Sequence, residues 1–469
     1  MSLLFHCFST AKQKYVFDAN TNSVFTVDEQ QFEALSEVEH GKETLENKKI
    51  LYNLQSKGYC KDVVIEQIYN PDTEIIDAHL DKKMRVIVLQ VTQRCNLRCS
   101  YCAYSGRYKN RLHSLKRMNF ETAKCAIDFA LSHSEDTKSL VFSFYGGEPL
   151  LELPLIKDCV EYINKQAPNR EIIFSMTTNG TLLTPEVYGY LNEKGFNIAI
   201  SLDGPKIVHD ASRKHPDGSG SYDRIMENIQ AIKKLYPESV NKIRFNAVLS
   251  PEITDSCLPS VFKSDDVVLY YNQTASTVSD RYTDNQSRYS EAFVLNYNRE
   301  KCKLLLSMAR KLNKKHVSTL LGMRESQLGR ENIRLQRIPR INPVCHPGGP
   351  CLAGAMRLFV SAEGKFFPCE RVSENSELMA IGELENGFDL EKVKKVMNPG
   401  QVTQDQCKKC WAINHCSLCA AFSDDMTGLS SQVRLSNCPK SKSDYEEVLK
   451  EICFLKEAGC TFNNQGGAK

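Results

Sequence analysis

Three cysteines stand close together in the segment VTQRCNLRCSYCAYSG, residues 91–106. Cys95, Cys99 and Cys102 have the spacing CxxxCxxC, and no fourth cysteine lies near them in the sequence. Structural zinc sites normally use four protein ligands, so three thiolates imply a distant fourth ligand or an open coordination position. Cysteine thiolates also hold iron–sulfur clusters, and three of them leave one iron free for a small molecule. The motif therefore predicts either a zinc site or an iron–sulfur cluster.

The whole chain is rich in cysteine, with 19 among its 469 residues. The N-terminal stretch MSLLFHCFST has no basic region ahead of a long apolar run, so we expect no signal peptide and a cytoplasmic protein. In a reducing compartment this many thiols indicates metal or cluster ligation rather than disulfides. Eight of the cysteines lie between residues 345 and 438, at Cys345, Cys351, Cys369, Cys407, Cys410, Cys416, Cys419 and Cys438.

The composition is that of an ordinary globular protein, with 41% hydrophobic and 25% charged residues. The formal net charge is only +3, so no strong field favours nucleic acid or a membrane surface. The basic stretch GRYKNRLHSLKR at 106–117 is local, and we interpret it as a solvated loop. No apolar run approaches the roughly 20 residues that a membrane span requires. We therefore expect neither a nucleic acid nor a membrane as a partner.

Six short apolar runs alternate with amphipathic segments between residues 85 and 273. The runs are RVIVLQVT, SLVFSFYGG, EIIFSMTTNG, FNIAISLDG, IRFNAVLS and DVVLYYNQ, and the segments between them include ETAKCAIDFALSH, LPLIKDCVEYINKQ and SYDRIMENIQAIKKLY. Runs rich in Val, Ile and Phe are typical of strands buried on both faces. The alternation predicts an α/β fold, a partial (β/α)6 TIM-like barrel over residues 81–310. Active sites in such folds lie at the carboxyl ends of strands, and the cysteine motif directly follows the first run.

The regions on either side of this segment have a different character. Residues 1–80 contain QKYVFDANTNSVFTVD, which predicts two strands about a polar turn, followed by helices at EQQFEALSEV and KKILYNLQSKGYC. From residue 345 cysteine, glycine and proline dominate, and long periodicity is scarce. We therefore expect residues 311–469 to form a C-terminal domain whose folding depends on bound metal.

The CxxxCxxC spacing, with Tyr101 before the last cysteine, resembles the radical S-adenosylmethionine (SAM) superfamily. The resemblance implies a [4Fe-4S] cluster held by Cys95, Cys99 and Cys102, with S-adenosylmethionine chelating the fourth iron. The cosubstrate would then be the missing fourth ligand. Tyr101 is included among the residues expected to bind the cofactors.

Three later motifs follow the next three predicted strands and resemble further elements of this superfamily. YGGEP at 145–149 looks like the motif whose backbone and glutamate hold the methionine amino group. TTNG at 177–180 and SLDG at 201–204 occupy positions where similar enzymes place polar groups near the ribose and carboxylate. The cofactor-binding candidates carried over in this way are Gly146, Gly147, Glu148, Asn179, Ser201 and Arg213.

The C-terminal cysteines resemble the SPASM extension of peptide-modifying radical enzymes, which binds two auxiliary [4Fe-4S] clusters. The resemblance assigns Cys345, Cys351, Cys369 and Cys419 to the first cluster, and Cys407, Cys410, Cys416 and Cys438 to the second. The sequence departs from the pattern at one point, because two residues separate Cys416 and Cys419 where three are usual. A pair of zinc knuckles is the alternative, since CxxC recurs in both kinds of site.

The segment HPGGPCLAGAMRLFVSAEGKFFPCERVSE at 346–374 resembles maturases of the ranthipeptide and SCIFF group, which install thioether crosslinks in cysteine-rich ribosomal peptides. The N-terminal module resembles the winged-helix-like element that binds a leader peptide by adding it as a strand. The resemblance implies a 5′-deoxyadenosyl radical as the reactive species, a precursor peptide as substrate and an external electron donor such as flavodoxin or ferredoxin. The alternatives are a sulfatase-maturing enzyme that oxidises a single Cys or Ser, and a zinc-binding scaffold protein.

Overall fold

A parallel sheet of six strands forms the centre of the chain in a computed structural model that describes residues 3–42, 44–109, 111–251, 253, 267–269, 271–337, 341–349 and 351–462. The strands are β5 (Val86–Thr92), β6 (Ser139–Gly146), β7 (Glu171–Thr178), β8 (Asn197–Ser201), β9 (Ile243–Leu249) and β10 (Asn272–Thr277). Each pairs in parallel with the next along the chain. The sequence therefore predicted the α/β class and the parallel sheet correctly.

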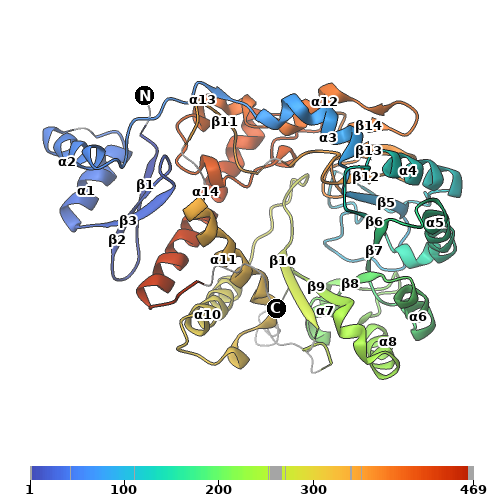
Figure 1. The fold of residues 1–469 in the computed structure, drawn as a ribbon. Coiled ribbons are helices and arrows are strands. Elements are labelled where there is room, and N and C mark those ends of the chain that lie inside the picture. Colours follow the sequence, from blue (N-terminus) through green and yellow to red (C-terminus); the bar gives the residue numbers. More distant parts are fainter. Residues whose placement is uncertain are drawn as a thin grey trace.

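Helices cover the outer side of the curved sheet (Figure 1). They are α4 (Phe120–Ser132), α5 (Leu153–Gln166), α6 (Pro185–Glu193), α7 (Lys206–Ser212) and α8 (Tyr222–Leu235). The predicted segments at 121–133, 153–166 and 221–236 correspond to α4, α5 and α8. Asn119 and Thr184 cap α4 and α6 by accepting hydrogen bonds from backbone N–H groups in the first turn, which explains where these helices begin.

The two faces of the parallel sheet differ in the size and burial of their side chains. On β6, Phe142 and Phe144 are fully buried in the core that includes the outer helices, whereas Ser143 between them is only half-buried. Ser143 is paired with Ser175 of β7, and half-buried Ser201 ends β8. Closed TIM barrels fill their interior with bulky branched side chains, whereas small polar residues here leave the inner face open.

The sixth strand lies further along the chain than its apolar run predicted. The run DVVLYYNQ spans 266–273, but Val267–Leu269 form a turn and β10 covers the polar sequence NQTAST. Residues 266 and 270 lie outside the described residues. β10 ends one edge of the sheet and its residues are half-buried or exposed, so a hydrophobic pattern could not reveal it.

The N-terminal module consists of a three-stranded antiparallel sheet and two helices. The strands β1 (Phe5–Ser9), β2 (Lys14–Asp18) and β3 (Ser23–Val27) pair in the order β1-β2-β3. The predicted hairpin corresponds to β2 and β3, and the predicted helices to α1 (Glu29–Glu39) and α2 (Leu45–Ser56). β1 was not predicted, because FHCFS does not alternate between apolar and polar residues.

The segment that joins this module to the sheet packs against both C-terminal and central parts of the chain. It contains β4 (Gln67–Ile68), a 3-10 helix (Pro71–Ile75) and α3 (Ile76–Lys82). Ile76 and Leu80 of α3 belong to the main hydrophobic core under the parallel sheet. The boundary placed at residue 80 in the sequence therefore falls inside a helix of the central core.

The C-terminal part extends the same sheet beyond β5. β12 (Leu358–Val360) pairs in parallel with β5, and β13 (Lys365–Phe367), β14 (Gly382–Glu383) and β15 (Gly387–Phe388) continue in antiparallel fashion. β11 (Val344–Cys345) pairs with β4. Helices α10 (Glu291–Met308) and α11 (Gly322–Arg337) precede these strands, and α12 (Leu390–Met397), α13 (Gln404–Cys407) and α14 (Ser431–Glu457) follow them.

The longest helix, α14, was not predicted from the sequence. It contains Pro439 in its interior and directly follows the segment of dense cysteines, two signals that argue against a long helix. Tyr445, Val448 and Leu449 of α14 pack in a second core with the N-terminal strands. The helix is therefore stabilised by tertiary packing.

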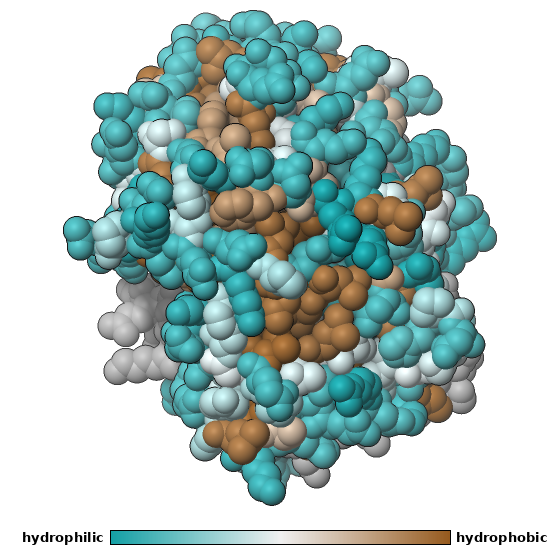
Figure 2. Space-filling view, turned by 90° about the vertical axis from the view of Figure 1, so that its right-hand side faces the viewer, coloured by the Kyte–Doolittle hydropathy of each residue, from teal (hydrophilic) through white to brown (hydrophobic). Residues whose placement is uncertain are grey.

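The surface of the side that carries α4, α5 and α6 is largely hydrophilic, with a hydrophobic patch in its middle (Figure 2). Apolar side chains of these helices that pack against the main core remain partly exposed, among them Leu155 and Val187. Among the described residues, no helix is long and apolar enough to cross a membrane.

Candidate active site

The three-cysteine motif forms a loop directly after β5, at the carboxyl edge of the parallel sheet. Backbone N–H groups of Leu97 and Tyr104 donate to the sulfurs of Cys95 and Cys102, each at 3.4 Å. Burial raises the pKa of Cys95 to about 12 and that of Cys99 to about 11. Such thiols stay protonated at neutral pH unless a metal displaces the proton.

Gly146 and Gly147 hold the beginning of this loop against the end of β6. A Cβ atom on Gly146 would collide with the carbonyl oxygen of Thr92, and one on Gly147 with that of Arg94. The N–H groups of Gly147 and Glu148 donate to these same two carbonyls at 2.9 and 2.8 Å. The glycines are therefore needed for close approach of two backbone segments, and they fix the residues just before Cys95.

The carboxylate of Glu148 joins the end of β6 to the end of β7. It is fully buried and accepts hydrogen bonds from Thr178 Oγ1 and Asn179 N, both at 2.7 Å, and from Leu150 N at 3.0 Å. Burial raises its pKa, while these donors oppose the rise. Three protein donors thus already hold the glutamate that the sequence assigned to the cosubstrate.

Asn179 lies beside the first cysteine of the motif. Its Nδ2 is 3.8 Å from Cys95 Sγ and donates to Asn96 Oδ1 at 2.8 Å. Its Oδ1 accepts from Thr181, so the orientation of the amide is set by partners on both sides. Ser201 lies on the inner face at the end of β8, opposite Asn246 in the register with β9.

Tyr101 and Arg213 meet at Asp203, a residue of SLDG that was not singled out in the sequence. Arg213 Nε and Nη2 donate to the two Asp203 oxygens at 2.9 and 3.1 Å, and the Tyr101 hydroxyl donates to the same carboxylate. The Arg213 guanidinium also lies over the Tyr101 ring, 5.4 Å from its centre. The buried Arg213, expected to bind a ligand carboxylate, already has a protein carboxylate as its partner.

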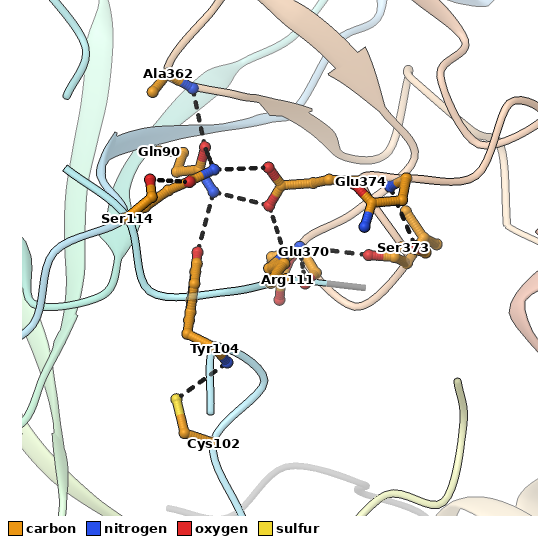
Figure 3. Close-up of polar contacts among 12 residues, drawn as sticks. Gln90, Cys102, Tyr104, Arg111, Ser114, Ala362, Glu370, Ser373 and Glu374 are labelled. Carbon is orange, nitrogen blue, oxygen red and sulfur yellow. Dashed lines mark hydrogen bonds and ion pairs between the residues drawn. The ribbon is translucent and has the colours of Figure 1, made fainter. Parts of the chain in front are cut away.

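A buried polar network connects the cysteine loop to the C-terminal part (Figure 3). Gln90 of β5 donates to the Tyr104 hydroxyl at 3.0 Å and to Glu374 at 2.8 Å. Arg111 forms an ion pair with Glu374 and donates to the carbonyl oxygen of Glu370 at 2.6 Å. Arg111 comes from the basic stretch that we interpreted as solvated, yet only 4% of it is exposed. For this residue the interpretation was wrong.

A cavity of about 1000 Å³ opens near the cysteine loop. Val278 lines it and also packs against Tyr101 and Tyr108 in a small hydrophobic cluster. Its other walls include Tyr289, Phe293 and Phe422. The cavity therefore joins an aromatic surface to the neighbourhood of the three cysteines.

The C-terminal cysteines fall into two groups. Burial raises the pKa of Cys369 to about 11, and the neighbouring thiols of Cys419 and Cys351 add to the rise. Burial likewise raises the pKa of Cys410 to about 11, with contributions from Cys416 and Cys407. The pKa of Cys438 is raised by burial and by the same two thiols, Cys416 and Cys407.

Cys345 lies with the second group, although the resemblance assigned it to the first. Burial raises its pKa to about 11, and among the described residues the thiol of Cys407 adds to this rise. Cys345, Cys407 and Cys410 contact the second hydrophobic core, whereas Cys369 and Cys419 contact the main core. The structure thus brings together three of the four thiols expected for the first cluster.

Residues 89–264 match the family model of the radical SAM superfamily. The chain contains a radical SAM domain. It is 34% identical over 38% of its length to an uncharacterized protein, MJ0907, of Methanocaldococcus jannaschii, covering 55% of that protein. It is 30% identical over 33% of its length to a cysteine-type anaerobic sulfatase-maturating enzyme of Clostridium novyi, covering 41% of that enzyme. The chain thus spans about half the length of these two relatives or less.

A longer match joins the radical SAM domain and its flanking regions to the radical SAM cyclopropyl synthase TigE of Paramaledivibacter caminithermalis. The two are 24% identical, over 75% of this chain and 73% of TigE. Among solved structures, native anSMEcpe with bound AdoMet is 21% identical, with a TM-score of 0.59 over 80% of this chain and all of that one. At this identity the structural match establishes the fold.

The radical SAM domain implies a [4Fe-4S] cluster and S-adenosylmethionine, and the residues present fit both. The loop offers three buried thiols with backbone donors to sulfur, and the sheet beside it presents small polar side chains on an open inner face. Among the described residues, no three His, Cys, Asp or Glu side chains converge on one metal-ion position. A cube does not require such convergence, because each thiolate binds a different iron.

Proposed function

We propose that the chain is a radical SAM peptide maturase that installs thioether crosslinks between a cysteine sulfur and another residue of a ribosomal precursor peptide. The observation that carries this proposal is the N-terminal sheet with an unpaired edge strand, docked on the cysteine-rich C-terminal part. The cofactors, when bound, supply hydrogen-atom abstraction at the acceptor carbon and take up the surplus electron. An external donor such as flavodoxin or ferredoxin provides the initiating electron.

In this proposal Cys95, Cys99 and Cys102 hold the radical SAM cluster. Gly146, Gly147 and Glu148 fix the loop that carries these thiolates, and Asn179 and Ser201 face the cosubstrate from the ends of β7 and β8. Arg213 and Tyr101 lie at the same edge of the parallel sheet, where both donate hydrogen bonds to Asp203. The C-terminal cysteines hold two auxiliary clusters, as in a SPASM domain.

The leader peptide would add to β3. β2 cannot accept it, because it is the central strand and has a partner on each side. β1 lies against α14 and β3 against α11, and the residues of β3 are half-buried apart from the exposed Thr26. Phe25 and Tyr59 form an aromatic pair there, with ring centres 4.7 Å apart. An exposed edge with a nearby aromatic contact suits strand addition by a peptide.

Contacts between the module and the C-terminal part support a recognition role close to the active site. The His6 ring stacks on Trp411, with ring centres 4.1 Å apart, next to Cys410. Asn22 accepts a hydrogen bond from His415 Nε2 at 2.7 Å. A peptide held on β3 is therefore at high local concentration near the proposed clusters.

Formylglycine formation is the second candidate, supported by the sulfatase-maturating relatives and by the fold match with anSMEcpe. One of the matched structures is anSMEcpe with AdoMet and the Cp18Cys peptide. The match leaves about a fifth of this chain without a counterpart, and a leader-binding module would account for such an extension. Ring formation of the kind named for TigE is a third outcome, which the same product analysis detects.

The test uses anaerobically purified full-length protein and a cysteine-rich precursor peptide that carries its leader. Deleting residues 1–80 would remove Leu4, Phe8 and Phe17 from the second core, so point variants are preferable. Thr26→Pro should block pairing at the edge of β3. We expect weaker binding of the isolated leader and loss of crosslinking, while S-adenosylmethionine cleavage without peptide continues.

Ala11→Pro, in the exposed turn between β1 and β2, is the matched control and should bind leader normally. Mass spectrometry should show the loss of one hydrogen pair for each crosslink, with the sulfur retained. An aldehyde at a single Cys or Ser would favour the sulfatase-maturating activity instead. Zinc without iron or sulfide in the purified protein would support the scaffold alternative and refute the enzyme.

A further inference from the structure

Arg434 is the largest fully buried side chain of the described residues, with 1% of its surface exposed. It lies on α14, one turn before Cys438, whose sulfur contacts the Arg434 carbonyl oxygen at 3.5 Å. Its Nη1 donates to the Leu418 carbonyl oxygen at 3.1 Å and to Ser423 Oγ at 3.2 Å. Its Nη2 is 3.9 Å from Cys416 Sγ. The guanidinium thus lies between the backbone next to Cys419, which belongs to the first cysteine group, and the thiol of Cys416, which belongs to the second.

This guanidinium lacks an anionic partner among the described residues. No ion pair involves Arg434, and its buried Nε has no hydrogen-bond acceptor. Arginine cannot be deprotonated in proteins, and a buried charge without compensation is strongly destabilising. On the neighbouring helix α11, the half-buried Arg324 has Glu451 of α14 as its partner at 2.8 Å. Arg434 therefore requires an anion that protein side chains do not provide.

Among the described residues, the acidic groups that Arg434 contacts are the thiols of Cys416 and Cys438. Cys416 Sγ accepts from Arg434 Nη2 directly, and Cys438 Sγ lies 3.5 Å from the Arg434 carbonyl oxygen. Thiolates bound to iron, together with inorganic sulfide, would give the guanidinium both a counter-charge and acceptors for its free N–H. The unsatisfied donor is thus explained by a cluster at Cys407, Cys410, Cys416 and Cys438.

We propose that Arg434 is a positioning residue that donates hydrogen bonds to the sulfurs of this auxiliary cluster and raises its reduction potential. The inference rests on the proposed function, which supplies the auxiliary clusters. Hydrogen bonds to cluster sulfurs and nearby positive charge stabilise the reduced, more negative state. A cluster tuned in this way is suited to accept the electron that remains after a substrate carbon radical has bonded to sulfur.

The test is a reductive titration of the anaerobic protein, followed by electron paramagnetic resonance. Arg434→Met removes the charge and the donors, and Arg434→Gln keeps a donor without the charge. In both variants we expect one auxiliary cluster to become harder to reduce by at least tenfold in the reduction equilibrium constant, about 59 mV for one electron. The radical SAM cluster should titrate as in the wild type.

Arg324→Met is the matched control, because it removes a half-buried arginine on the helix next to α14 that has its own carboxylate partners. Its cluster potentials should stay unchanged. The inference would be overturned if Arg434 variants that carry all their clusters have wild-type reduction potentials. If Arg434→Met loses its iron, the titration of Arg434→Gln decides. A wild-type protein that contains only four irons would instead refute the auxiliary clusters, and with them the proposed function.

Discussion

Arg111 and Glu374 form a buried ion pair between the loop after the cysteine motif and the C-terminal part of the chain. Only 1% of the Arg111 side chain and 11% of the Glu374 side chain are exposed. Gln90 and Gln93 also donate to the Glu374 carboxylate, at 2.8 and 3.2 Å. The Glu374 carboxylate is therefore held by Arg111, Gln90 and Gln93. These contacts fix the C-terminal part of the chain relative to the radical SAM loop.

Glu374→Gln should destabilise the protein strongly, because it leaves the Arg111 charge buried without its counter-ion. Breaking a buried pair in this way costs about 3 kcal/mol or more. Lys116 and Glu363 form a similar contact at 2.8 Å that is about half exposed, so Glu363→Gln is the matched control. It should cost at most about 1 kcal/mol. Thermal unfolding of the three proteins measures the difference, and equal midpoints would contradict the expectation.

The central fold was predictable because its short apolar runs alternate with amphipathic helical segments. The first run, RVIVLQVT, is typical of a parallel strand covered on both faces, and β5 is indeed buried at every residue after its first. The polar edge strand β10 and the helix α14 were missed for the opposite reason. β10 is too polar for a hydrophobic pattern, and α14 is held by contacts with distant residues such as Phe17.

The site was predictable only as far as local motifs reach. Spacing identified the cysteine loop, and the glycines at 146–147 were found by motif, although their contacts are with protein backbone. Asp203, Arg111 and Arg434 were missed, because their roles depend on partners brought close by folding. A buried arginine cannot be distinguished from a solvated one by its neighbours in the sequence.

Replacement of Cys95, Cys99 or Cys102 by Ala should abolish reductive cleavage of S-adenosylmethionine, because the incomplete cluster loses its binding site. Iron content should fall by roughly a third, since the two proposed auxiliary clusters should remain. Cys125→Ala on the exposed face of α4 is the control and should keep full activity. Formation of 5′-deoxyadenosine at wild-type levels by the motif variants would show that these cysteines are not the ligands.

Glu148→Gln should weaken S-adenosylmethionine binding without loss of iron. The amide nitrogen would face a donor at Thr178, Leu150 or Asn179, and an unsatisfied buried donor costs about 1–3 kcal/mol. The displaced segment includes Asn179, which lies beside Cys95. Equilibrium binding measures the effect, and Glu161→Gln on the exposed face of α5 should leave the dissociation constant unchanged. An unchanged constant for Glu148→Gln would argue against this role.

His209 should make the protein less stable in mild acid. It is fully buried, its Nδ1 accepts from Asp203 N at 3.2 Å, and burial lowers its pKa to about 4. Because the folded pKa lies below the unfolded value of about 6.5, its stabilisation is complete above pH 6.5 and is lost as pH falls towards 4. Lowering pH from 7 to 5 should cost about 2 kcal/mol through this group.

Thermal unfolding across this range measures the slope for wild type and for His209→Gln. The variant should show a shallower decline, although His415, whose pKa burial also lowers, keeps part of it. His40→Gln, at an exposed position, should follow the wild-type curve. Parallel curves for His209→Gln and wild type would show that His209 titrates normally in the folded state.

Cys345→Ala should disturb the same auxiliary cluster as Cys407→Ala. Cys345 and Cys407 both contact the second hydrophobic core, the Cys407 thiol raises the pKa of Cys345, and β11 pairs with β4 in the segment before α3. Electron paramagnetic resonance of the reduced variants should show matching changes for these two, and a different change for Cys369→Ala. If Cys345→Ala instead matches Cys369→Ala, the assignment implied by the family resemblance holds. The expected result would leave Cys351, Cys369 and Cys419 as the three protein thiolates of the first cluster.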